Sequence, residues 1–341
     1  MVEPVFFDFS QGTMSENFAV ATPVRVGIVG TGYAAQRRAE VFRGDRRSQL
    51  VSFWGNSEAN TAKFADTFGV RPQQSWQALI NDPEIDLVLI ATINQLHGAI
   101  AEAALQAGKH VVLEYPLALT YAMGKKLQQL AREKGKLLHV EHIELLGGVH
   151  QAIRQNLGKI GEVFYARYST IMGQNPAPQR WTYHHQQFGF PLVAALSRIS
   201  RFTDLFGTVQ QVDAQCRFWD QPNPEYFRAC LATAYLQFNN GLKAEVIYGK
   251  GEVFHQNERI FTLHGDRGTL IFVGETGRLI QGQTETEITV GSRRGLFRQD
   301  TEAVLDYLTT GKPLYVDLEA SLYALEVADL CAQACGYKVE N

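Results

Sequence analysis

The chain has 341 residues, of which 45% are hydrophobic and 20% are charged, a composition typical of globular proteins with room for two domains. Its net charge of −3 gives no electrostatic case for binding nucleic acid or an anionic membrane. No apolar run approaches the roughly 20 residues that a membrane-spanning helix needs. The four cysteines lack metal-ligand spacing, which favours reduced thiols in a cytoplasmic protein.

Residues 1–13 precede a second methionine, Met14, and are interpreted as a vector-derived leader. They contain neither the basic segment nor the apolar segment of a secretory signal. We therefore begin the predicted fold at residue 14.

A glycine-rich turn follows the first predicted strand, residues 24–29, and opens a helix over residues 36–42. In this strand–turn–helix context the GxGxxA pattern indicates a dinucleotide site, because the glycines let a pyrophosphate approach the backbone at a helix N-terminus. The alternative is a glycine turn without a ligand, but the βαβ pattern that follows favours a dinucleotide. The residues predicted to contact it are Gly30, Thr31, Gly32, Tyr33 and Ala34.

The second predicted strand, residues 50–54, indicates which dinucleotide is bound. Proteins that prefer NAD usually carry Asp or Glu at its end to bind the ribose hydroxyls. This chain has Asn56 and Ser57 there, so NADPH is favoured, and NADH stays possible. Arg37 and Arg38, just past the glycine turn, are sources of positive charge for a 2′-phosphate.

Strands and helices continue to alternate up to residue 134. Helices are predicted at 59–68, 76–81, 97–107 and 118–134, and strands near residue 70 and at 85–91 and 110–113. This order predicts a Rossmann domain with a doubly wound parallel sheet over residues 14–140.

Polar residues follow two of these strands, at the sheet edge where ligands bind in α/β folds. Thr92 is expected to contact the cofactor. His97 is either a packing residue at a helix start or a contact near the nicotinamide. Glu114 and Tyr115 follow the strand at 110–113.

The second half of the chain is predicted to contain mostly strands. Residues 137–146 are predicted to be a strand, whose alternation places His139 and Glu141 on one face and His142 and Glu144 on the other, so no metal site is expected. Helices are predicted at 149–157 and 318–336, and strands at 162–170, 209–218, 226–238, 242–248, 259–264, 269–273, 278–281 and 285–290. Short turns between strands predict an α+β domain, residues 141–341, with a large and mostly antiparallel open sheet. Its free face is expected to serve as a platform for a large flat ligand.

Residues 91–119, ATINQLHGAIAEAALQAGKHVVLEYPLAL, resemble the Gfo/Idh/MocA oxidoreductase family. The resemblance implies that the members that oxidise sugars have their catalytic lysine at the position of Tyr115. It also places Val193 and Ser197 near the aspartate and histidine of their DxGxH pattern. Removing a hydroxyl proton needs a base, and this chain lacks both the lysine and the histidine that would handle that proton.

Two further runs, the segment from Leu113 through EHIELL and FGFP followed by SRI, resemble one branch of that family, the biliverdin reductases of the cyanobacterial type. This resemblance implies NADPH-dependent reduction of a linear tetrapyrrole, biliverdin, to bilirubin at its central methine carbon. It makes Arg198 and Tyr115 the catalytic candidates, with Arg198 polarising a pyrrole nitrogen, relaying a proton or binding a propionate. Glu114 is then expected to hold the nicotinamide amide or to orient Tyr115.

The substrate's two propionates call for basic partners. His142, Arg180 and Arg201 are predicted to contact the substrate, with Arg167, Arg228 and Lys250 as further candidates, and Arg293 and Arg294 are interpreted as a solvated turn. Two alternatives stay open: a sugar or polyol dehydrogenase with an unusual base, and a non-catalytic dinucleotide-binding regulator. The sequence does not determine whether the chain forms oligomers.

Overall fold

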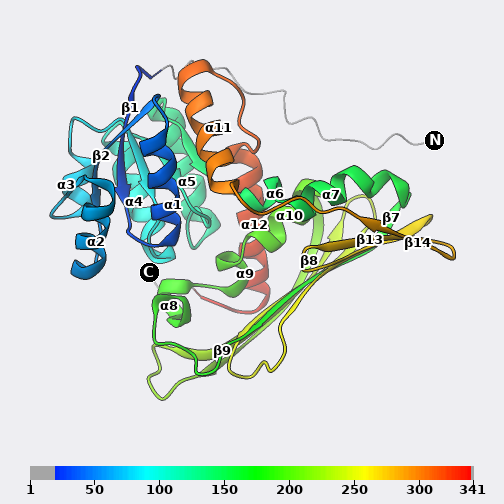
Figure 1. Cartoon of the computed structure of the whole chain (residues 1–341). Helices are drawn as coiled ribbons and strands as arrows, with labels where there is room; N and C mark the ends of the chain where they lie inside the picture. The colour runs from blue at the N-terminus through cyan, green and yellow to red at the C-terminus, as the bar shows by residue number, and fades with distance from the viewer. Residues whose placement is uncertain (1–19, 339–341) are drawn as a thin grey trace.

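The computed structural model of the protein describes residues 20–338, so the interpretation of residues 1–13 as a leader lies outside the described residues. The chain forms two β-sheets, each with helices packed against it (Figure 1). Within this range no helix is long and apolar enough to cross a membrane.

The first sheet has six parallel strands in the order β3-β2-β1-β4-β5-β6, which confirms the predicted doubly wound Rossmann domain. Its strands are β1 Val24–Val29, β2 Ser48–Trp54, β3 Arg71–Pro72, β4 Leu87–Ile90, β5 His110–Leu113 and β6 Leu138–Val140. Its helices are α1 Tyr33–Gly44, α2 Glu58–Phe68, α3 Trp76–Ile80, α4 Asn94–Gln106 and α5 Tyr121–Lys134. The central strands are buried throughout because helices cover both faces of the sheet.

Local capping explains where the helix before the domain junction begins and ends. Thr120 precedes α5, and its hydroxyl accepts a hydrogen bond from the Met123 N–H. Gly135 ends the helix with a φ of 57°, a left-handed conformation that glycine adopts without strain. The chain then turns back into β6.

The predicted strand over residues 137–146 is wrong in its second half. β6 ends at Val140, and the short helix α6, Ile143–Leu146, follows. The argument from alternating strand faces therefore does not apply to His142 and Glu144. The finding on metals rests instead on proximity: among the described residues, no three His, Cys, Asp or Glu side chains lie close enough together to hold a metal ion.

The second sheet has eight strands in the order β14-β13-β12-β11-β7-β10-β9-β8, and every neighbouring pair is antiparallel except β7 and β10. The predicted open sheet is confirmed. Its strands are β7 Val163–Gly173, β8 Val209–Asp220, β9 Phe227–Phe238, β10 Lys243–Gly251, β11 Glu258–Gly265, β12 Gly268–Val273, β13 Thr276–Gln281 and β14 Thr284–Ile288. The remaining helices are α7 Gly148–Asn156, α8 His185–Phe188, α9 Pro191–Ala194, α10 Ser197–Phe206, α11 Leu296–Thr310 and α12 Leu318–Ala334, with 3₁₀ turns η1 Leu157–Lys159 and η2 Trp181–Tyr183.

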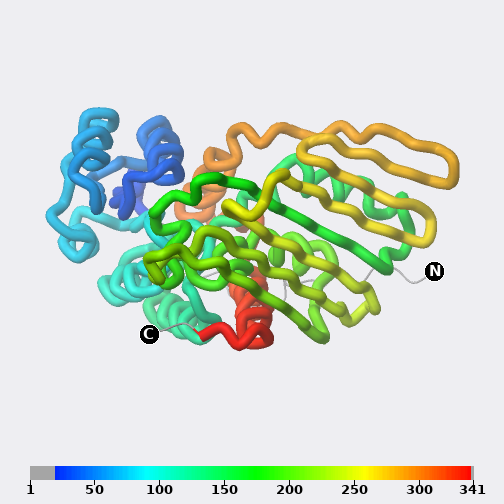
Figure 2. Tube along the Cα trace, turned by 90° about the horizontal axis from the view of Figure 1, so that it is seen from below, coloured from blue at the N-terminus to red at the C-terminus, as the bar shows by residue number. Residues whose placement is uncertain are grey.

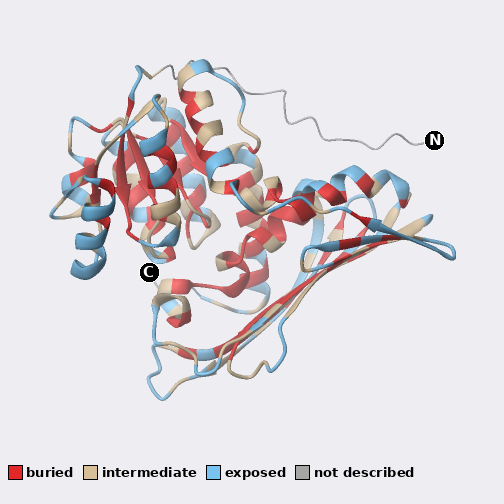
Figure 3. Ribbon diagram, viewed as in Figure 1, coloured by how far each residue is buried: buried red, intermediate tan, exposed pale blue. Residues whose placement is uncertain are grey.

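Only one face of this sheet is covered by helices. Figure 2, seen from below, shows the other face bare, with the helices behind the strands. Tyr168 and Thr170 of β7 point to the covered face and are buried, whereas Arg167 and Tyr235 lie on the bare face beside Glu245. Figure 3 shows buried residues running from the first sheet through α10 into the second.

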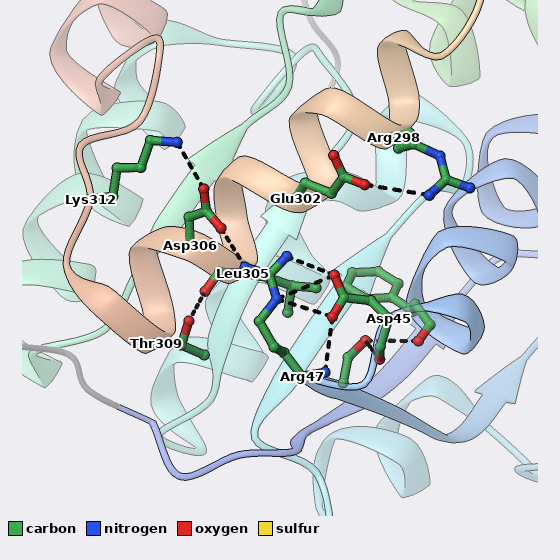
Figure 4. A network of polar contacts seen from close by, with 10 residues as sticks. Asp45, Arg47, Arg298, Glu302, Leu305, Asp306, Thr309 and Lys312 are labelled. Carbon is green, nitrogen blue, oxygen red and sulfur yellow. Dashed lines mark hydrogen bonds and ion pairs between the residues drawn. The ribbon is translucent and has the colours of Figure 1, made fainter.

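Helix α11 was not predicted, and it joins the two halves of the chain. It follows β14 but packs on α1 in the first domain, where Val304, Leu305 and Leu308 are fully buried (Figure 1). Figure 4 shows a polar link at the outer side of this contact. Arg47, which follows α1, binds both Asp45 and Asp306 of α11.

Candidate active site

The glycine turn between β1 and α1 fits a dinucleotide. Gly30 has a φ of 126°, and a Cβ added there would lie 2.0 Å from the Ala91 carbonyl oxygen, so only glycine fits this close crossing of two strands. Gly32 starts α1 without a side-chain cap, and a Cβ built on it would meet no atom within 4 Å. Gly32 and Tyr33 are exposed, so the start of α1 is accessible, as binding of a pyrophosphate requires.

The other residues predicted to contact the cofactor surround this turn. Thr31 is buried against Gly55, where an added Cβ would lie 2.5 Å from Thr31 Cγ2. Tyr33 is exposed, and Asn56 and Ser57 are exposed at the end of β2. The donor groups that could hold a ribose phosphate are thus accessible.

Of the two arginines predicted to supply positive charge here, Arg38 is not available. Its side chain is fully buried, and it pairs with Glu114 (Nε to Oε1, 2.7 Å) and with Asp300 of α11. Burial alone would lower the pKa of Arg38, but these carboxylates outweigh it and raise that pKa. Arg37 is about half exposed and pairs with Glu40 at 2.6 Å, so it stays the candidate.

Asp300 gathers further buried groups at the junction of the domains. Its Oδ1 accepts a hydrogen bond from Tyr315 Oη at 2.7 Å and lies 2.9 Å from His139 Nε2. Although burial acts to raise the pKa of Asp300, the charge of Arg38 lowers it overall. This network fixes the position of Glu114 at the end of β5.

His97 is a packing residue. Its ring is buried between two backbone carbonyls, with Nδ1 2.8 Å from the Pro116 oxygen and Nε2 3.2 Å from the Thr92 oxygen. It joins the loops that follow β4 and β5 rather than facing a ligand. Burial lowers the pKa of His97, which favours the neutral ring.

The two predicted catalytic residues converge on one hydroxyl. Ser197 Oγ, at the start of α10, accepts hydrogen bonds from Tyr115 Oη at 3.3 Å and from Arg198 Nη1 at 2.9 Å. Tyr115 comes from the first domain and the other two from the second. The structure therefore brings Tyr115, Ser197 and Arg198 together across the domain junction.

Arg198 is held by neutral groups. Its Nε donates to Thr170 Oγ1 at 3.1 Å, and its guanidinium carbon lies 5.2 Å from the Tyr248 ring centroid. Burial alone would lower the pKa of Arg198, but nearby tyrosines led by Tyr115 raise it overall. Among the residues that the structure describes, no carboxylate forms an ion pair with this guanidinium, so its charge is available to a ligand.

His142 lies beside Tyr115, with the two rings near parallel (11°) and their centroids 6.2 Å apart. It is buried, and neither ring nitrogen has a hydrogen-bond partner in the described part of the chain. Burial, with a contribution from His139, lowers its pKa to about 4, so the ring is neutral. A neutral imidazole here offers one donor and one acceptor.

The other residues predicted to contact the substrate are less well placed. Arg201 is buried and binds Glu144 Oε2 at 2.5 Å, and Arg180 is exposed and donates to Thr182 Oγ1 at 2.9 Å. Lys250 is buried against the rings of Tyr183, Phe188 and Phe227, Arg167 lies on the bare face of the sheet, and Arg228 lies 3.8 Å from Glu252. The bare face cannot be the platform for the site, because Arg198 and Thr170 lie on the covered one.

Sequence reasoning missed two arginines near the site. Arg293 binds both oxygens of Glu144, and Arg259 Nη2 lies 3.5 Å from Glu144 Oε2. Arg293 does lie in a turn and is partly exposed, but it is paired with Glu144 and not only solvated. No local pattern marks this pairing, since Arg293 and Glu144 are separated by 149 residues.

Known proteins are similar to this chain, one in its structure and others in their sequence. A 3-ketoreductase from Actinomadura kijaniata, in complex with NADP and TDP-benzene, superposes with a TM-score of 0.79 at 20% identity over 92% of this chain and 98% of that one. Biliverdin reductase A from mouse is 26% identical over 316 residues, which are 92% of this chain and 96% of that protein, and the human protein is 25% identical over similar shares.

Two family models together match most of the chain. The model of the oxidoreductase family's NAD-binding Rossmann fold matches residues 24–142, and that of its C-terminal alpha/beta domain matches residues 152–340. These matches, with the glycine turn and the two sheets, show that the chain is an NAD(P)-dependent oxidoreductase that belongs to the Gfo/Idh/MocA family.

Proposed function

We propose that the chain reduces biliverdin to bilirubin with NADPH, by hydride transfer to the central methine carbon. The observation that carries this proposal is Arg198, a guanidinium bound to Ser197 and Thr170 without a carboxylate partner among the described residues. When bound, NADPH supplies the hydride. The methine accepts it more readily if a neighbouring pyrrole nitrogen is polarised, because the electron pair must end there.

Arg198 polarises that nitrogen in this proposal. An arginine is a poor proton donor, since its pKa exceeds about 12, so water delivers the proton that completes the reduction. Burial raises the pKa of Tyr115, which keeps its phenol protonated and able to donate a hydrogen bond. Ser197, which both residues bind, sets the distance between them.

The comparisons support this choice of substrate over a sugar. The similarity to mammalian biliverdin reductase A extends over nearly the whole of both chains, although at 26% identity or less. By contrast, the 1,5-anhydro-D-fructose reductase of Ensifer adhaerens is 32% identical over 41% of this chain. The groups that a sugar dehydrogenase would use are replaced by Tyr115, Val193 and Ser197.

NADPH is proposed over NADH because the exposed residues after β2, Asn56 and Ser57, carry no charge that would repel a 2′-phosphate. A cytoplasmic location is proposed because the four cysteines are free thiols.

The test of the activity is direct. Purified protein is mixed with biliverdin and NADPH, and the bilirubin absorbance is followed from acidic to neutral pH. We expect product with NADPH and less product with NADH at the same concentration. If no bilirubin forms at any pH, the proposed function is wrong; preference for NADH would refute the argument from Asn56 and Ser57.

Replacing Arg198 tests its role. Arg198→Ala is expected to lower kcat by about 100-fold or more, the usual effect of removing a donor that stabilises developing charge. NADPH affinity, measured by fluorescence titration, should stay within about twofold because Arg198 lies outside the glycine turn. Arg278→Ala, at an exposed arginine of the same domain that pairs with Glu285 at the surface, is the control. Equal turnover in Arg198→Ala and the control would remove Arg198 from the mechanism.

A further inference from the structure

Three arginines surround one carboxylate close to the site. Glu144, on α6, accepts hydrogen bonds from Arg201 at 2.5 Å and from Arg293 Nη1 at 3.0 Å, and Arg259 Nη2 lies 3.5 Å away. Although burial acts to raise the pKa of Glu144, these arginines lower it to about 2. Glu144 is thus ionised, and three guanidinium groups with one carboxylate leave two positive charges uncompensated.

The arginine cluster, defined as Arg201, Arg259 and Arg293 around Glu144, has unused donors. Arg201 Nε and Nη1 are buried and lack a hydrogen-bond partner among the described residues. Buried donors without acceptors are unfavourable and rare in folded proteins. The side chains of Arg259 and Arg293 are 34% and 37% exposed, so the cluster is open to a ligand on their side.

The cluster adjoins the proposed reaction centre. Arg201 lies three residues after Arg198 on α10, which places both on one side of that helix, about 4.5 Å apart along its axis. Arg259 of β11 pairs directly with Thr170 of β7, the residue that binds Arg198 Nε. Directly opposed residues in an antiparallel pair project from the same face of the sheet. A ligand that reaches Arg198 would therefore lie beside Arg259.

We propose that Arg259 and Arg293, held in place by Glu144 and backed by Arg201, bind a carboxylate of the substrate. This inference rests on the proposed function, since biliverdin carries its two propionates on the pyrrole rings that the central methine joins. A propionate lies close to the reacting carbon, as the cluster lies close to Arg198. Guanidinium groups bind carboxylates through paired, charge-assisted hydrogen bonds, and an incoming carboxylate would offset the surplus positive charge.

The test compares biliverdin with its dimethyl ester, in which both propionates are neutral. Binding is measured by quenching of protein fluorescence, without turnover, for the wild type and for Arg259→Gln, Arg293→Gln and Arg294→Gln. Arg294 is an exposed neighbour of Arg293 and serves as the matched control. We expect Arg259→Gln and Arg293→Gln to bind biliverdin about tenfold more weakly, equivalent to the loss of about 1.4 kcal/mol, and to bind the ester like the wild type. Arg293→Lys should recover part of the affinity.

Two results would overturn the inference: equal biliverdin affinity in Arg293→Gln and Arg294→Gln, or wild-type affinity for the ester equal to that for the acid. Near-ultraviolet circular dichroism of each variant identifies any that has lost its fold, in which case Arg293→Lys replaces it.

A wild type that neither binds nor reduces biliverdin would refute the proposed function, and a second probe then tests the anion site on its own. Inorganic phosphate is added to protein saturated with NADPH. A rise in Tm for the wild type and Arg294→Gln, but not for Arg293→Gln, supports an anion site at the cluster. The same rise in all three proteins overturns it.

Discussion

At the scale of single residues, what distinguishes Arg198 is its surroundings. Arg38 and Arg201 are buried and Arg198 is partly buried, but Arg38 and Arg201 are each bound to a carboxylate, Arg38 to Glu114 and Arg201 to Glu144. The charge of Arg38 is therefore offset by its carboxylate partners, and Arg201 shares Glu144 with Arg259 and Arg293. Arg198 is bound to the hydroxyl groups of Thr170 and Ser197, which do not neutralise its positive charge. That charge can therefore act on a ligand near Tyr115.

His142 gives a prediction about acid stability. Its pKa is about 4 in the folded protein and near 6.5 when unfolded, so between these values the unfolded chain takes up a proton that the folded chain does not. Stability is therefore lost as pH falls through this window, by about 2 kcal/mol at pH 5. In His142→Phe, which keeps a ring against Tyr115, the loss in urea unfolding free energy from pH 7.5 to pH 5 should be smaller by this amount.

The control is His255→Phe, at an exposed histidine, which should lose as much stability on acidification as the wild type. His110, whose pKa burial also lowers to about 4, contributes equally to all three proteins. A loss in His142→Phe as large as that of the wild type would show that His142 is not buried in neutral form.

Residues near one another in sequence were predictable, and distant pairings were not. The glycine turn and the replacement of lysine by Tyr115 stand in continuous motifs, so their places followed from the sequence. The partners of Glu144 did not, because Arg201, Arg259 and Arg293 come from a helix, a strand and a loop. The sequence around Arg38 did not predict that its side chain is buried, since its partner Asp300 lies 262 residues away.

At the scale of elements, α11 is the longest helix that the sequence did not predict. Its apolar residues at 296, 297, 304, 305 and 308 do have helical spacing, but the segment follows a hairpin and its start has no side-chain cap. Its packing partner α1 lies more than 250 residues earlier. The predicted boundary after residue 140 separates the strands of the two sheets, whereas α11 crosses back to the first.

The buried pair of Arg38 and Asp300 should hold α1 and α11 together. Arg38→Met leaves Asp300 as an uncompensated buried charge and is expected to lower the unfolding free energy by about 3–5 kcal/mol in urea. Arg38→Met combined with Asp300→Asn should cost less than the sum of the single changes, since neither charge is then left alone. Asp306→Asn, in the same helix but at a pair near the surface, should cost about 1 kcal/mol or less. Additive effects in the double variant would contradict this account.

At the scale of the whole molecule, the two sheets share one core. A single cluster of buried apolar residues includes Val29 and Ile90 of the first sheet and Phe227 and Val246 of the second. The domains are therefore not two bodies joined by a linker, and the junction that carries Tyr115 and Ser197 lies within continuous packing.

This shared core predicts that both domains unfold in one step. The four tryptophans divide evenly, with Trp54 and Trp76 in the first domain and Trp181 and Trp219 in the second. A Trp181→Phe/Trp219→Phe variant reports the first domain by fluorescence, and a Trp54→Phe/Trp76→Phe variant reports the second. Far-ultraviolet circular dichroism reports both domains. Within each variant, its urea midpoint should equal the midpoint from fluorescence, because neither domain keeps its core once α11 and the junction separate. NADPH, the cofactor that we propose for the first domain, should raise both fluorescence midpoints equally. If NADPH left the urea midpoint of the second domain unchanged, the two domains would unfold independently.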